Sequence, residues 1–234
     1  MTNGKDKAAG DAGTGQEGPA ASRPRKDRIL DAAEALFAKH GFDGVTMRQV
    51  AMAASVDVAL PNYHFGSKRG LFDAVLLRRA EVLNRERLQA LEDCTKAAGS
   101  GGPAAEAIID AFLRPLLSDS HAEEEGWRHY YELIAQVNNS PEWGGVLMTK
   151  YFDPLVRRFM EALKRALPQA DEADIYWCYH FLSGALTLTF AQTGRIDHLS
   201  GGKCRSDDLQ AAYERMVPFV AAGFRHICGG DPPS

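Results

Sequence analysis

The chain has 234 residues, and 45% of them are hydrophobic, which is enough to build one large or two modest domains around a proper core. Its formal net charge of −4 excludes a protein that coats nucleic acid through overall charge. The charge is uneven, because residues 23–72 carry eight Lys or Arg and five Asp or Glu, whereas residues 73–234 carry 17 and 23. A basic head on an acidic body is typical of a protein that meets DNA at one end only.

The sequence contains no feature that indicates export, a membrane span or a metal site. The N-terminus lacks the apolar segment of a signal peptide, and the longest apolar stretch, residues 178–191, is shorter than the roughly 20 residues of a membrane span. The four cysteines are widely spaced and form no CxxC pair, so we expect free thiols. We therefore predict a cytoplasmic protein with no metal, no cofactor and no membrane partner.

The N-terminal segment changes character after about twenty residues. Residues 1–22 are rich in Gly, Ala and charge, without a large apolar side chain after Met1, which predicts a disordered tail. Basic residues follow, and among them Arg25 and Lys26 could form either an arm near the DNA backbone or a solvated tail. An amphipathic helix is expected over 27–40, and Gly41 should end it.

The stretch TMRQVAMAASVDVALPNYHFGSK, which begins at Thr46, predicts two short helices joined by a tight turn. Thr46 and Gln49 have the spacing of a capping box, which would begin a helix over 47–54. Asp57 offers an N-cap to a second helix over 58–63. That second helix is too short to stand alone, so neighbours must hold it and leave its outer face free, as in a helix-turn-helix unit.

The rest of the chain predicts a series of longer helices. Ser67 should cap a long helix over 68–95, which would link the head to the body. Further helices are expected over 104–117, 123–138, 142–167, 171–193 and 207–227. Pro154 should kink or divide its helix, and residues 194–206 should form a polar loop. Because no alternating strand pattern occurs, we predict an all-α protein with about nine helices.

Three runs within residues 27–72 carry a resemblance to a known family: ILDAAEALFAKHGFDGVTMRQVA, NYHFGSK and GLF. They resemble the N-terminal domain of the tetracycline-repressor (TetR) family of bacterial transcriptional regulators. The resemblance covers about a fifth of the chain. It implies a helix-turn-helix DNA-binding domain over 23–72, followed by a helical ligand-binding and dimerisation domain over 73–234.

Four residues match positions at which the family contacts the DNA backbone or a base. Arg48 lies early in the first helix of the pair, where the family often places a base or phosphate contact. Thr46 could offer its hydroxyl or its backbone N–H to a phosphate. Tyr63 and Lys68 match phosphate contacts of the family.

Five further candidates lie on or beside the expected recognition helix. Val58, Ala59 and Pro61 could present only apolar surface, for example to a thymine methyl group. Asn62 stands where the family commonly has tyrosine, and it could read adenine or bind a phosphate. His64 matches a position that more often packs the small domain, and we retain it as a candidate contact.

The sequence departs from the family pattern at two positions. Ser55 stands where the family usually has a turn glycine, so a left-handed backbone there would carry a cost. Pro61 falls near the fourth position of the expected recognition helix, where it would remove a hydrogen bond and distort the helix.

In the body, TetR-like proteins bind a small molecule between the central helices. The candidates for this role are Trp127, Tyr130 and Tyr131 on one expected helix and Trp177, His180 and Phe181 on another. Their aromatic character fits a lipophilic effector such as a fatty acid, an acyl-CoA or an aromatic compound, although ordinary core or interface packing is the more common role for any single one of them. The resemblance also implies a homodimer formed through the last two helices.

These features together favour a ligand-responsive homodimeric transcriptional regulator, a repressor that binds a palindromic operator and is released by a lipophilic effector. The alternative is a DNA-bound scaffold or regulator that answers to a protein partner and has no small-molecule ligand. The sequence contains no GxSxG, HExxH or Walker motif, so we do not expect an enzyme.

Overall fold

The computed structural model describes residues 23–117, 125–141 and 143–229, and the ordered elements within these ranges are all helices. They comprise eleven α-helices and one short 3-10 helix, so the all-α prediction is confirmed. The tail expected over residues 1–22 lies outside the described residues. None of the described helices combines the length and apolar character that a membrane crossing requires.

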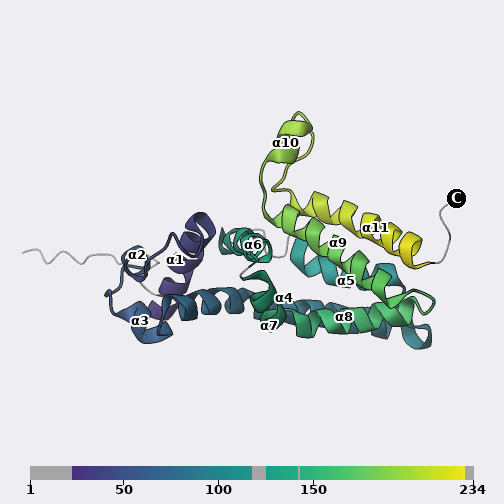
Figure 1. Ribbon diagram of the computed structural model, residues 1–234, viewed down its shortest axis with the longest axis horizontal. Coiled ribbons are helices and arrows are strands. Elements are labelled where there is room, and N and C mark those ends of the chain that lie inside the picture. The colour runs from purple at the N-terminus through teal and green to yellow at the C-terminus, as the bar shows by residue number, and fades with distance from the viewer. Residues whose placement is uncertain (1–22, 118–124, 142, 230–234) are drawn as a thin grey trace, which may run out of the picture.

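The first three helices of the chain form a small head at one end of an elongated molecule (Figure 1). They are α1 (Arg25–His40), α2 (Met47–Ala53) and α3 (Leu60–Phe65). Phe37 from α1 is fully buried and meets the ring of Phe72 edge-on, with ring centroids 5.0 Å apart. The buried side chains of the head belong to the same apolar cluster as those of the body, and packing on this cluster holds the helices α2 and α3, which are too short to be stable alone.

Helix α1 begins two residues earlier than the sequence predicted. Pro24 occupies the N-cap position, and Arg25 and Lys26 form the first helical turn. The backbone of these two exposed residues is fixed in the helix, so they form no flexible arm or tail, and their contact with DNA stays a prediction. Gly41 ends the helix with φ +68°, a left-handed conformation that glycine adopts without strain, as expected.

A single long helix joins the head to the body. Helix α4 (Lys68–Ala98) has 31 residues and is about 45 Å long at 1.5 Å per residue. The Ser67 hydroxyl accepts a hydrogen bond from the Gly70 N–H at 3.0 Å, so the predicted N-cap is confirmed. Figure 1 shows α4 running from the head along the whole body.

The body is built from the remaining helices. They are η1 (Gly99–Gly101), α5 (Ala105–Leu117), α6 (Glu125–Asn138), α7 (Gly144–Tyr151), α8 (Asp153–Ala166), α9 (Glu172–Phe190), α10 (Arg195–Leu199) and α11 (Leu209–Cys228).

Two differences raise the number of α-helices from about nine to eleven within the described residues. Pro154 lies in the first turn of α8, where its missing N–H is harmless, so the expected helix over 142–167 is divided near Phe152. The expected polar loop contains the short helix α10, which follows the left-handed residue Gly194 (φ +70°).

The head and the body are joined by polar contacts as well as by α4. Glu34 of α1 is only 1% exposed and accepts hydrogen bonds from Arg78 (2.9 Å) and Arg79 (2.8 Å) of α4. From α6, the Gln136 side-chain amide donates to the Ala38 carbonyl oxygen at 2.7 Å. A shift of α4 or α6 in the body is therefore transmitted directly to α1.

Candidate nucleic-acid interface and effector cavity

The first helix of the pair begins as the sequence predicted. The Gln49 N–H donates to the Thr46 hydroxyl oxygen at 3.2 Å, and the Thr46 N–H donates to the Gln49 side-chain oxygen at 2.8 Å, which is a complete capping box. The Thr46 hydroxyl lies 2.8 Å from that same Gln49 oxygen. Both groups that Thr46 could offer to a phosphate thus already have a partner within the head.

The turn between the two helices is left-handed at Ser55, where φ is +52°. This agrees with the expectation for a residue that replaces a turn glycine. The Arg28 guanidinium donates to the Ser55 carbonyl oxygen at 3.3 Å and so fixes the turn against α1. Asp57 accepts from the Ala59 N–H at 2.8 Å, but α3 itself starts only at Leu60, two residues later than predicted.

The late start of α3 overturns both expectations for Pro61. Pro61 is the second residue of α3, and the N–H groups of a first helical turn have no partner within the helix, so no helical hydrogen bond is lost. Its ring is buried against the head, so it does not present apolar surface to a base. The predicted distortion and the predicted contact of Pro61 are therefore wrong.

The remaining candidates of the helix pair are exposed residues of α2, of α3 and of the segment between them, and we call this group the α2–α3 face. Its members are Arg48, Val58, Ala59, Asn62, Tyr63 and His64. The Tyr63 side chain is 81% exposed, and its ring centroid lies 5.2 Å from that of His64. The face thus combines a guanidinium, an amide, a phenol, an imidazole and apolar groups, the chemical set that proteins use on phosphates and base edges.

Lys68 lies beside this face but its ammonium points into the head. It donates to the carbonyl oxygens of Phe42 (3.0 Å) and Val45 (3.1 Å) and lies 4.3 Å from the centroid of the Phe42 ring. Two of its three protons therefore tie the start of α4 to the loop before α2. A phosphate contact through the third proton stays a prediction.

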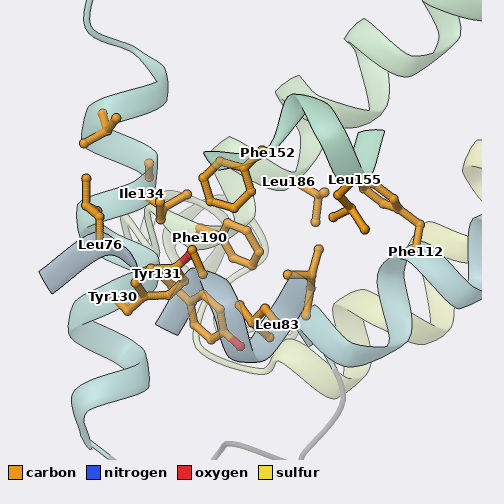
Figure 2. Close-up of a cluster of buried hydrophobic side chains, with 14 of the residues drawn as sticks. Leu76, Leu83, Phe112, Tyr130, Tyr131, Ile134, Phe152, Leu155, Leu186 and Phe190 are labelled. Carbon is orange, nitrogen blue, oxygen red and sulfur yellow. The ribbon is translucent and has the colours of Figure 1, made fainter. Parts of the chain in front are cut away.

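In the body, six helices line a small apolar cavity, which we call the central cavity. Figure 2 shows aromatic and aliphatic side chains from α4, α5, α6 and α9 and from the α7–α8 junction converging there. The volume is about 60 Å³, and the walls include Leu83, Phe112, Tyr130, Ile134, Phe152 and Phe190. A cavity of this size holds roughly two water molecules, well below the roughly 300–1,000 Å³ of typical ligand pockets.

Of the six predicted effector contacts, Tyr130 lines the central cavity. Tyr131 is buried nearby, but its ring is stacked on that of Phe190, with centroids 4.6 Å apart. Trp127 is also buried, and its ring lies 4.7 Å from the guanidinium carbon of Arg79, at the contact between head and body. Trp127 and Tyr131 are therefore core residues in this structure.

The other three predicted contacts point away from the cavity. Trp177 and Phe181 are 56% and 58% exposed, and their rings are stacked with centroids 6.0 Å apart. His180 is exposed beside them. Placing these three side chains in an effector pocket was wrong, because the buried side of α9 carries residues such as Leu182 and Leu186 instead.

The exposed side of α9 continues onto α11, which packs beside it (Figure 1). We call this surface the α9–α11 face. Its large apolar members are Tyr176, Trp177, Phe181, Leu188, Phe219 and Ile227, with exposures between 41% and 74%. Large apolar side chains exposed in this number on two adjacent helices are uncommon on a monomer and are typical of interaction sites.

The sequence analysis did not identify Arg87, which lies on α4 in the wall of the central cavity. Arg87 is 4% exposed, and its guanidinium carbon lies 3.8 Å from the centroid of the Phe112 ring. A signal was present in the sequence, because Arg87 stands four residues after Leu83 and four before Leu91, both of which are buried. This spacing puts Arg87 on the inward face of the helix.

Asn138 contributes a polar side chain to the same cavity. It is the last residue of α6, and its side-chain amide donates to the Thr187 hydroxyl. Thr187 in turn donates to the Ser183 carbonyl oxygen at 2.8 Å. The cavity lining therefore includes polar groups as well as aromatic rings.

Two family models match the chain over separate segments. The model described as "Bacterial regulatory proteins, tetR family" matches residues 29–75, and the model described as "Tetracyclin repressor-like, C-terminal domain" matches residues 110–223. The first segment contains the head and the start of α4, and the second contains most of the body.

Curated relatives are similar over about half of their length. The biofilm operon icaADBC negative transcriptional regulator IcaR of Staphylococcus aureus is 38% identical over 117 residues, which are 50% of this chain and 55% of the relative. The transcriptional regulator UidR of Escherichia coli is 24% identical over 134 residues, which are 56% of this chain and 60% of the relative.

Solved structures share the fold over nearly the whole chain. The fatty acid degradation regulator FadR of Bacillus halodurans has a TM-score of 0.63 at 14% identity and covers 87% of this chain and 98% of its own. A tetR-family regulator from a Shewanella species has a TM-score of 0.58 at 18% identity, covering 88% and 97%. At these identities the likeness concerns the fold alone.

Proposed function

Because this chain belongs to the TetR family of bacterial regulatory proteins, we propose that it is a ligand-responsive homodimeric transcriptional repressor. It would bind a palindromic operator and be released by a small apolar effector. The observation that carries the proposal is the α2–α3 face, where Arg48, Asn62 and Tyr63 are exposed while the apolar side chains of the head are buried. The name of the relative IcaR, a negative transcriptional regulator, supports repression as the direction of control.

Dimerisation is supported by the α9–α11 face. Phe219 and Leu188 are 74% and 66% exposed there, and burying them against a second copy would remove a large apolar area from water. A two-fold dimer would present two heads to the two halves of a palindromic site, about 34 Å or one DNA turn apart. The face lies at the opposite end of the molecule from α3, so it leaves both heads free (Figure 1).

The effector signal would travel along α4. Leu83 of α4 lines the central cavity, and Arg79 of the same helix binds Glu34 of α1 one turn closer to the head. An effector larger than the 60 Å³ cavity must push the surrounding helices apart. The accompanying shift of α4 would move α1 and change the separation of the two heads, so that effector and operator oppose each other reciprocally. To shift the protein from the DNA-binding to the non-binding state, the effector must bind the non-binding state more tightly by a few kcal/mol.

The test is a fluorescence-anisotropy titration of the full-length protein with DNA that flanks its own gene. Scrambled DNA of the same length is the control, and both are measured at two salt concentrations. We expect tight, sequence-selective binding that weakens with salt and is released by an apolar effector. Absence of selectivity at both salt concentrations would refute the proposal.

A second candidate function is supported by the small volume of the central cavity. A cavity of about 60 Å³ is also compatible with a DNA-bound regulator that answers to a protein partner through its body. Selective operator binding that no small molecule disturbs would favour this alternative.

A further inference from the structure

Arg87 is a buried cation in the wall of the central cavity. It is 4% exposed, and its Nε is buried without a hydrogen-bond acceptor. Within the described part of the chain, no carboxylate forms an ion pair with it. Buried charges in proteins are almost always paired and hydrogen-bonded, because an unpaired charge in an apolar interior is costly. An unpaired one therefore needs an explanation.

The surroundings of Arg87 do not supply that explanation. Desolvation lowers its pKa to about 10, so the guanidinium still carries its charge at neutral pH. Its nearest ring, Phe112, covers one face of the guanidinium at 3.8 Å but offers no acceptor for its N–H groups. The described residues that line the central cavity include no Asp or Glu and no second Lys or Arg. The described residues therefore leave the charge of Arg87 unpaired, and a ligand in the cavity could supply the missing anion.

We propose that the effector is a monocarboxylic acid with an apolar body, and that its carboxylate pairs with Arg87 inside the central cavity. A planar guanidinium stacked on a ring keeps its edge free, and that edge matches a carboxylate in a two-point contact. A single cation balances a single negative charge, so a phosphate dianion or an acyl-CoA is disfavoured. The inference rests on the proposed effector response and adds the chemical class of the ligand.

The side chains that line the cavity indicate the chemical character and the size of the rest of the ligand. Leu116, Ile134 and Val156 offer only hydrocarbon surface to the body of the acid. The present volume of about 60 Å³ accommodates little more than a carboxylate-sized group. The apolar part of the acid must therefore displace flexible wall residues such as Met148. Both the ion pair with Arg87 and the displacement of the walls would act on α4.

The test uses isothermal titration of the full-length protein with octanoate and phenylacetate, and with octanamide and phenylacetamide as uncharged counterparts. We expect the acids to bind wild type about 10- to 100-fold more tightly than their amides, the value of a hydrogen bond to a charged group. Arg87→Met should abolish this preference, and Arg87→Lys should retain part of it. Arg85→Met, an exposed arginine on the same helix, is the matched control and should behave as wild type.

Three results would overturn the proposal: amides that bind as tightly as acids, an Arg87→Met protein that keeps the preference, or no binding of either acid at millimolar concentration. If Arg87→Met does not fold, the acid–amide comparison on wild type and Arg87→Lys decides. The operator assay separates this inference from the proposed function. Acids that bind through Arg87 but leave DNA binding unchanged would refute the effector response, whereas operator release by neutral compounds, independent of Arg87, would refute the inference alone.

Discussion

The buried ion cluster between α1 and α4 offers a quantitative test of how the head is attached to the body. Glu34 is 1% exposed, and its two oxygens accept from Arg79 Nε (2.8 Å), Arg79 Nη2 (3.0 Å) and Arg78 Nη2 (2.9 Å). Glu34→Gln keeps the shape but removes the charge and leaves one acceptor oxygen where there were two.

The expected loss in the free energy of unfolding depends on how deeply the arginine partners of Glu34 are buried. The Arg79 and Arg78 side chains are 12% and 27% exposed, so water can replace the lost carboxylate only in part. Removing one member of a buried pair costs roughly 3–5 kcal/mol. Arg78 keeps a second partner in Asp31 at 2.7 Å, so we expect the lower end, about 3 kcal/mol.

Urea unfolding of the full-length protein measures this loss, and Asp31→Asn is the matched control. Asp31 binds the same Arg78, but its side chain is 41% exposed, so its removal should cost less than about 1 kcal/mol. Equal losses for the two variants, or a loss below 1 kcal/mol for Glu34→Gln, would refute the argument that burial makes this cluster strong.

Three further predictions concern exposed and buried side chains. Arg48→Ala should weaken operator binding and lower the salt slope by about one unit in an anisotropy titration if Arg48 binds a phosphate, while sedimentation still reports a dimer. Phe219→Asp puts a charge on the α9–α11 face, so sedimentation should report monomers, and unchanged dimers would contradict the proposed interface. Cys178 and Cys228 are buried with Sγ atoms 3.9 Å apart, and desolvation raises the pKa of the Cys178 thiol to about 12. Because the thiolate is the reactive form, alkylation at pH 8 followed by mass spectrometry should label the exposed Cys204 first. Equal labelling of these thiols in the folded protein would contradict the burial.

The sequence by itself determined the architecture of the head. Caps and breakers act within a few residues, so Thr46, Ser67 and Gly41 marked helix ends that the structure confirms. The exception is α3, which starts at Leu60 because Asp57 and Ala59 form a hydrogen-bonded turn first. That two-residue shift turned Pro61 from the expected outer face to the core.

Only the tertiary structure decided which side chains of the body share a cavity. Helical periodicity separates two faces of a helix, but it does not say whether an apolar face meets the core or a partner. Trp177 and Phe181 resembled pocket residues in sequence and lie on the outer surface, because the opposite side of α9 fills the core. The spacing of Leu83 and Leu91 puts Arg87 on the inward face of α4, but only the packing of Phe112 from α5 against it shows that a charged side chain is buried there. Burial depends on contacts between residues far apart in the chain, and those contacts exist only once the helices have packed.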